Sequence, residues 1–96
     1  MSSYFLALID IRDAAEYERY LAGFDAAFAP FEGEVIAVED HPRVLEGTWS
    51  AGRTVLIRFP DDDALRRWYD SPAYQAIARH RRAAATADIA VITGRD

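Results

Sequence analysis

The chain has 96 residues, which is the size of one domain and too short for two domains with separate cores. Its hydrophobic fraction of 51% and charged fraction of 28% are those of an ordinary globular protein, which excludes disordered and fibrous classes. The formal net charge of −5 disfavours a nucleic-acid partner, because phosphate contacts need clustered positive charge. We therefore expect residues 1–96 to form a single domain.

The first half of the chain predicts a strand, a helix and a second strand. Residues 3–11 form a short apolar run without glycine or proline, which is typical of a buried strand. A helix is predicted over residues 13–29, with a capping-box spacing at Asp13, aromatic side chains at helical intervals and Pro30 as its end. The apolar run at residues 34–39 predicts the next strand.

The second half predicts two more strands around a helical region. Residues 54–59 form the third strand, which we expect to pair antiparallel with the second. The helical region opens after Pro60 with a run of aspartates, restarts at Ser71-Pro72 and ends near Ala84. Residues 87–93 form the last strand. The resulting order, β-α-β-β-α-β, predicts an α+β, ferredoxin-like fold with a four-stranded antiparallel sheet and two helices on one face.

This fold leaves one face of the sheet without a cover. Two helices cover a single face, yet the runs at 3–11, 34–39 and 87–93 place apolar side chains on both faces. No further element is available in 96 residues. We therefore expect a homodimer in which two copies pack sheet against sheet.

Cysteine is absent, which removes disulfides, thiolate nucleophiles and cysteine-based metal sites. The histidines at positions 41 and 80 lack the spacing of a metal site, so we expect no metal and no cofactor. No apolar run reaches the ~20 residues that a membrane span needs, and the first residues lack a secretory signal. A cytoplasmic protein without a membrane partner is expected.

Several segments carry a family resemblance, which extends over nearly the whole chain. They are Val44-Leu45-Glu46-Gly47-Thr48-Trp49, Ile57-Arg58-Phe59-Pro60, Trp68-Tyr69-Asp70-Ser71-Pro72-Ala73-Tyr74-Gln75, and Arg81 followed by an alanine-rich stretch and Gly94. In them the chain resembles the bacterial domain-of-unknown-function family 1330, of the dimeric α+β barrel superfamily. The resemblance implies the same dimeric barrel, but no reaction, substrate or cofactor. Enzymes of the wider superfamily, including cofactor-free monooxygenases and small isomerases, use a cleft between the sheet and its helices, an analogy of fold alone.

Arg81 is the candidate anion-binding residue. It follows Tyr74 by seven residues, about two helical turns, and so leaves the same apolar helix face. A guanidinium on that face needs a carboxylate, backbone carbonyls or a ligand. The alternatives are an anionic ligand in a cleft between this helix and the sheet, or a structural pair with one of the acids Glu46, Asp88 and Asp10.

Four further residues are candidates for lining the same cleft. Trp68, Tyr69 and Tyr74 either fill the core or combine a core side with a pocket side, where their indole and phenol groups could meet a ligand. Arg58, on the third strand, is the fourth candidate.

Two residues are candidates for acid–base catalysis. His41 follows Glu39-Asp40, whose carboxylates could make it a proton donor and acceptor, but a histidine before Pro42 is also typical of an inert loop. Glu46 could be a buried carboxylate suited to proton transfer, or a structural partner of Arg58 or of backbone amides.

The sequence thus predicts a homodimer that binds a small organic molecule, anionic if Arg81 recognises it. One alternative is a cofactor-free enzyme of the oxygenase or isomerase type. The other is a non-catalytic structural or partner-binding dimer. A pocket with convergent polar groups favours a ligand, whereas a filled interior favours the structural role.

Overall fold

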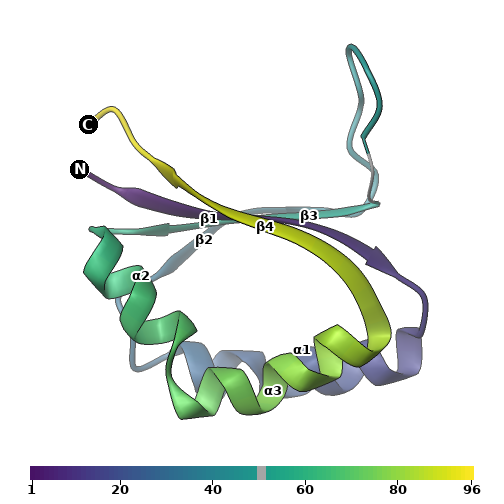
Figure 1. Ribbon diagram of the computed structural model, residues 1–96, viewed down its shortest axis with the longest axis horizontal. Coiled ribbons are helices and arrows are strands. Elements are labelled where there is room, and N and C mark those ends of the chain that lie inside the picture. The colour runs from purple at the N-terminus through teal and green to yellow at the C-terminus, as the bar shows by residue number, and fades with distance from the viewer. Residues whose placement is uncertain (50–51) are drawn as a thin grey trace.

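The computed structural model describes residues 1–49 and 52–96, which form one four-stranded antiparallel sheet with all helices on one face (Figure 1). In chain order the elements are β1 (Ser3–Ile11), α1 (Ala14–Phe28), β2 (Glu34–Glu39), β3 (Arg53–Phe59), α2 (Asp62–Tyr69), α3 (Pro72–Ala84) and β4 (Ala85–Thr93). The strand order across the sheet is β2-β3-β1-β4, so the first and third strands are central.

Each helix begins at a polar N-cap that the sequence predicts. The carboxylates of Asp13 and Asp61 and the hydroxyl of Ser71 each accept a hydrogen bond from the backbone N–H three residues further on. These bonds satisfy donors that the first turn of a helix leaves without a partner. The aspartate run after Pro60 therefore caps α2, as its sequence indicates.

The expectation of two helices is corrected, because the described residues contain three. Proline has no N–H and its ring clashes with a preceding helical turn, so Pro72 cannot continue α2. The chain instead ends α2 at Tyr69 and begins α3 with Pro72 in its first turn. The last strand also begins two residues earlier than predicted, because β4 follows Ala84 without a loop.

The two central strands place alternate residues on opposite faces of the sheet. On β1 the buried residues Phe5, Ala7 and Ile9 face the helices, whereas Leu6 and Leu8 lie half-buried on the other face. Register fixes the same alternation on β3, because Phe5 pairs with Ile57 and Leu6 with Leu56. An apolar stripe therefore runs across the face that no helix covers.

An aromatic cluster fills the interior beneath α2. The fully buried ring of Trp68 lies 4.3 Å from that of Tyr74, 5.1 Å from that of Phe5 and 5.4 Å from that of Phe59, measured between centroids. Such edge-to-face and offset contacts add to the free energy gained by burying the rings. This cluster holds α2 and α3 against the sheet.

The segment after β2 rises from the sheet on the side opposite the helices (Figure 1). Residues 40–49 contain three of the large exposed apolar side chains, with Leu45 83% exposed. They lie beside the uncovered face rather than over the helices.

Within the described part of the chain, no helix has both the length and the apolar character needed to cross a membrane.

Candidate functional site

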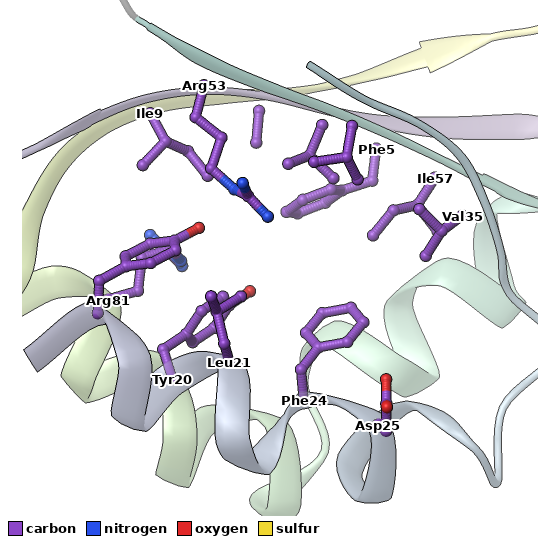
Figure 2. A pocket seen from close by; sticks show the side chains of 14 residues that line it. Phe5, Ile9, Tyr20, Leu21, Phe24, Asp25, Val35, Arg53, Ile57 and Arg81 are labelled. Carbon is purple, nitrogen blue, oxygen red and sulfur yellow. The ribbon is translucent and has the colours of Figure 1, made fainter. Parts of the chain in front are cut away.

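A cavity of about 170 Å³ lies between the sheet and α1 (Figure 2). Its roof is built from helix-facing residues of the three strands β1, β2 and β3, and its floor from one face of α1. The apolar side chains around it include Phe5, Ala7, Ile9, Val55, Ile57 and Leu21. The space exists because Ala7 and Val55, paired across the central strands, are small where the aromatic cluster has large rings.

Arg81 reaches this cavity from α3 and is 4% exposed. Its Nε and Nη2 atoms are buried and have no hydrogen-bond partner among the described residues. None of the three acids proposed as its structural partner, Glu46, Asp88 and Asp10, forms an ion pair with it in that part of the chain, and all three are exposed. The guanidinium therefore lies against the cavity with unused donors.

The aromatic surroundings of Arg81 favour its charged form. The guanidinium carbon lies 5.8 Å from the centre of the Tyr20 ring, which is within cation–π range. Burial opposes the charge, but Tyr74 and Tyr20 outweigh this effect and raise the pKa of Arg81 above its ordinary value. The residue is thus a cation in the interior at any physiological pH.

A second guanidinium, that of Arg53 at the start of β3, points into the same cavity (Figure 2). Its Nη1 donates to the Asp40 carboxylate at 2.7 Å, and its Nε is buried without a partner among the described residues. The guanidinium carbon lies 5.7 Å from the centre of the Tyr17 ring. Arg53 therefore has its charge balanced on one side and a free donor on the other.

Two phenols of α1 complete this end of the cavity. Burial raises the pKa of both Tyr17 and Tyr20, so both hydroxyls stay protonated. The Tyr20 hydroxyl shares a hydrogen bond of 2.8 Å with that of Tyr74. These groups can donate hydrogen bonds but are poor bases at neutral pH.

The opposite end of the cavity opens between α1 and β2. Val35 and Val38 line the cavity and are 42% and 47% exposed, and the exposed carboxylate of Asp25 stands beside them. The cavity thus has a cationic inner end, apolar walls and a single carboxylate at its mouth.

Of the residues predicted to bind a ligand, Arg81 lines this cavity and the others lie elsewhere. Trp68 and Tyr74 belong to the aromatic cluster, and Tyr69 lines a second, more open pocket of about 190 Å³ between α2 and the strands β1 and β4. Arg58 points to the uncovered face, where its Nε donates to the Ser2 hydroxyl at 2.9 Å. The cavity therefore lies between the sheet and α1 rather than beneath α2, because the aromatic rings beneath α2 pack against one another.

The two predicted acid–base residues are both exposed in the segment that follows β2. The backbone N–H of His41 donates to the Glu39 carboxylate at 2.9 Å, and neither His41 nor Glu46 lines the cavity. The expected pair between Glu46 and Arg58 is corrected, since Arg58 instead forms ion pairs with Glu34 at 3.8 Å and Asp96 at 3.9 Å. Because side chains alternate between the two faces of β3, Arg58 lies on the uncovered face, where it contacts Ser2 and Asp96 at the two chain ends.

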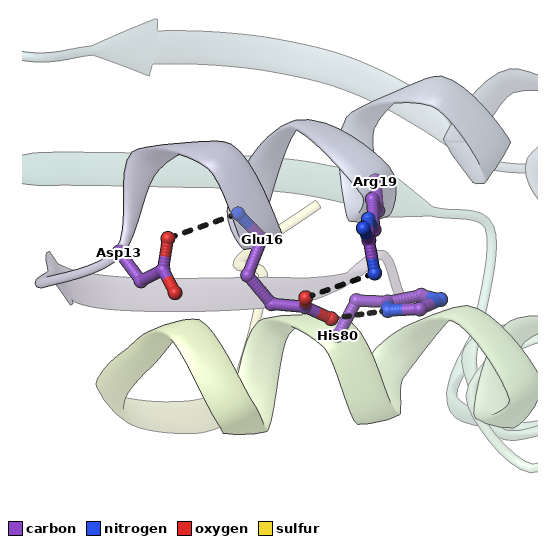
Figure 3. A network of polar contacts seen from close by, with 4 residues as sticks. All are labelled: Asp13, Glu16, Arg19 and His80. Atoms are coloured by element: carbon purple, nitrogen blue, oxygen red, sulfur yellow. Dashed lines mark hydrogen bonds and ion pairs between the residues drawn. The ribbon is translucent and has the colours of Figure 1, made fainter.

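The other histidine joins the two long helices. His80 on α3 contacts the carboxylate of Glu16 on α1, which also pairs with Arg19 at 3.3 Å (Figure 3). Glu16 follows the N-cap Asp13 by three residues, so the first two turns of α1 carry the part of the network that belongs to this helix. This network holds α1 and α3 together on the surface and does not line the cavity.

Sequence reasoning missed Arg53, Tyr17, Tyr20 and Asp25 as residues of the site. Arg53 could have been found, because it shares the two-residue period of Val55 and Ile57 and so belongs to the buried face of its strand. The tyrosines follow the helical spacing of core residues, and nothing in that spacing separates a cavity wall from a packed core.

Within residues 1–49 and 52–96, no group of three or more histidine, aspartate or glutamate side chains could hold a metal ion. At the inner end of the cavity the polar groups are the donors of Arg53, Arg81 and the tyrosines, which suit an organic anion better than a cation.

A four-stranded antiparallel sheet with its helices on one face places this protein in the ferredoxin-like class of folds. The model of a family described as "Domain of unknown function (DUF1330)" matches residues 2–95. The chain belongs to this family, which confirms the resemblance seen in its sequence motifs. No protein with a curated function matches the sequence.

Three solved structures illustrate the similarity. A protein of unknown function from Rhodopseudomonas palustris has a TM-score of 0.81 at 18% identity, over 99% of this chain and 83% of that one. SnoaB, a cofactor-independent oxygenase from Streptomyces nogalater, has a TM-score of 0.67 at 25% identity, over 99% and 94%. A dimeric ferredoxin-like protein of unknown function from Jannaschia sp. CCS1 has a TM-score of 0.69 at 14% identity, over 98% and 100%.

Proposed function

We propose that this protein is a homodimer that binds a small organic anion in the cavity between the sheet and α1. The observation that carries the proposal is Arg81, which is 4% exposed, lines the cavity and has two buried nitrogens, Nε and Nη2, without a hydrogen-bond partner among the described residues. A buried charge without a counter-ion costs several kcal/mol, whereas a bound carboxylate or phosphate satisfies a guanidinium through paired hydrogen bonds. The hollow interior supports a ligand-binding role over a purely structural one.

A thermal-shift screen tests the binding function. Small carboxylates and inorganic phosphate are added to the wild type, to Arg81→Met and to Arg79→Met, an exposed arginine on the same helix. A ligand at 100 times its Kd stabilises the folded state by about 2.7 kcal/mol, which is several degrees in melting temperature. We expect such a shift for the wild type and Arg79→Met and none for Arg81→Met. The same shift in Arg81→Met, or no shift with any anion, contradicts the proposal.

The homodimer is supported by the apolar stripe on the uncovered face of the sheet. Leu6 lies at its centre, paired in register with Leu56 on one side and Ala90 on the other. Ile92, on the same face, is 46% exposed. Ferredoxin-like proteins of similar structure from Jannaschia and Thermobifida fusca are described as dimeric.

Sedimentation equilibrium at micromolar concentration tests the dimer. We expect about twice the chain mass of 10.8 kDa for the wild type, and a monomer for Leu56→Arg, which places a charge in the stripe. Glu18→Arg, on the exposed face of α1, is the matched control and stays dimeric. Circular dichroism establishes that each variant is folded. A folded wild-type monomer at this concentration contradicts the dimer.

A second candidate is a cofactor-free oxygenase, favoured by the 25% identity to SnoaB over 99% of this chain. The exposed positions of His41 and Glu46 do not support them as its acid–base residues, so any base would come from the cavity, where Asp25 is the single carboxylate among the lining residues. Oxygen uptake with 1,4-hydroquinone as the probe tests this candidate. We expect uptake to be faster with the wild type than with Asp25→Asn, and equal rates contradict an oxygenase that uses Asp25.

A further inference from the structure

The charged groups of the cavity are divided between its two ends. At the inner end the guanidinium of Arg53 lies over the ring of Tyr17 and that of Arg81 over the ring of Tyr20, while Asp25 stands at the mouth. Tyr17 and Asp25 are eight residues apart on α1, which is about 12 Å along the helix axis. A ligand that reaches from one end to the other therefore meets a positive, an apolar and a negative environment in turn.

At the inner end of the cavity, the charges available to a ligand sum to little more than one positive charge. Arg53 already has Asp40 as a partner at 2.7 Å, so its charge is largely balanced although its Nε is free. Arg81 has no carboxylate partner among the described residues and supplies the uncompensated charge. The inner end thus suits one anionic group that lies beside the guanidiniums of Arg81 and Arg53.

The size and walls of the cavity limit the rest of the ligand. Its volume of about 170 Å³ is close to that of an engineered apolar cavity of about 150 Å³ that holds benzene. Phe24, Ile57 and Val35 line the part between the arginines and the mouth. A single six-membered ring, or an aliphatic group of that size, fits these walls.

We propose that the cavity selects monocarboxylates that carry one such ring or branched aliphatic group, and that Asp25 at the mouth excludes a second negative charge. This inference rests on the proposed anion-binding function and adds the ligand class and a specificity-determining residue. The carboxylate lies against Arg81 and Arg53, the apolar body lies along Phe24, and a group on its far side meets the Asp25 carboxylate. A dianion of the same shape is repelled there.

Isothermal titration with aromatic probes tests the selectivity. 4-Nitrobenzoate and terephthalate have nearly the same shape, but the nitro group is neutral where terephthalate has a second carboxylate. We expect 4-nitrobenzoate to bind the wild type at least about tenfold more tightly, which corresponds to about 1.4 kcal/mol. Asp25→Asn lowers this ratio at least about threefold, while Glu18→Gln, an exposed carboxylate change on the same helix, leaves it unchanged. Equal Kd values in the wild type, or an equal ratio in Asp25→Asn, overturn the selectivity.

The same titration separates this inference from the function on which it rests. Benzoate is expected to bind the wild type at least about tenfold more tightly than benzyl alcohol, and Arg81→Met removes this preference. If benzoate keeps its Arg81-dependent preference while terephthalate binds as well as 4-nitrobenzoate, anion binding stands and the role of Asp25 is wrong. If no aromatic anion binds, or benzyl alcohol binds as tightly as benzoate, both proposals fail.

Discussion

The two halves of the space between helices and sheet are built from similar residues but differ in packing. In the filled half, beneath α2, Trp68 and Phe59 are fully buried and their rings stack at 5.4 Å. In the hollow half, over α1, Phe24 and Arg81 face a cavity of about 170 Å³. Well-packed cores leave few spaces of this size, so the hollow half has given up packing energy that the filled half retains. The anion-binding function that we propose uses the hollow half.

Deleting a ring should cost more stability in the filled half than in the hollow half. Phe59→Ala removes a fully buried ring in contact with Phe28 and Trp68, and we expect it to lower the free energy of unfolding by about 3–5 kcal/mol. Phe24→Ala enlarges an existing cavity, so a loss of about 1–3 kcal/mol is expected. Urea unfolding at one fixed protein concentration measures both. Equal losses would show that the two halves are packed alike.

Adding volume should also cost more stability in the filled half than in the hollow half. Ala78→Leu forces extra atoms into the filled half, where Ala78 is fully buried, and should cost about 1–3 kcal/mol or more. Ala7→Leu projects into the cavity and should cost less than about 1 kcal/mol while it weakens benzoate binding. Urea unfolding and calorimetric titration check the two effects. A large loss of stability in Ala7→Leu would mean that the cavity closes in solution.

Replacing Arg81 should separate a ligand-binding residue from a structural one. A buried ion pair loses about 3–5 kcal/mol when one partner is removed, whereas a guanidinium without a carboxylate partner has little such energy to lose. We therefore expect Arg81→Met to leave the free energy of unfolding unchanged, or to raise it by up to about 1 kcal/mol. Arg79→Met, at an exposed position of α3, is the control. A loss above about 3 kcal/mol would assign Arg81 to the fold.

The smallest effect concerns the chain ends, which join the sheet at the edge of the filled half. Asp96 accepts hydrogen bonds from the backbone N–H and the hydroxyl of Ser2, at 2.9 and 2.7 Å, and these bonds lower its pKa to about 2. A carboxyl whose pKa is lower in the folded state stabilises the fold above its ordinary pKa, and this contribution disappears as the pH falls through about 2.

The melting temperature, measured from about pH 5 to about pH 2, tests this contact. This range spans the ordinary pKa of an aspartate, about 4, and the lowered pKa of Asp96, about 2. We expect a slightly shallower decline in Asp96→Asn than in the wild type. Glu18→Gln, at an exposed position of α1, should follow the wild type. Identical curves for Asp96→Asn and the wild type contradict a role for the contact in solution.

Local patterns of the sequence were enough to predict the elements, the class of fold and one residue that lines the candidate site. Strand and helix periods, the N-caps and Pro72 act within a few residues, so the bounds of β1 and β2 are those predicted. The helical spacing of Tyr74 and Arg81 likewise placed an arginine on a buried face. The number of helices needed correction, because the chain restarts a separate helix at Pro72, and so did the start of the last strand.

Where the interior is filled and where it contains a cavity depends on contacts that form only in the folded chain. Trp68 and Tyr20 both follow the spacing of core residues, yet one closes the filled half and the other walls the cavity. That outcome depends on which side chains meet across the layers, such as the small pair Ala7 and Val55 opposite α1. It also depends on register, which carries Arg53 to the inner end of the cavity. Such contacts join residues distant in the chain, so local patterns do not encode them.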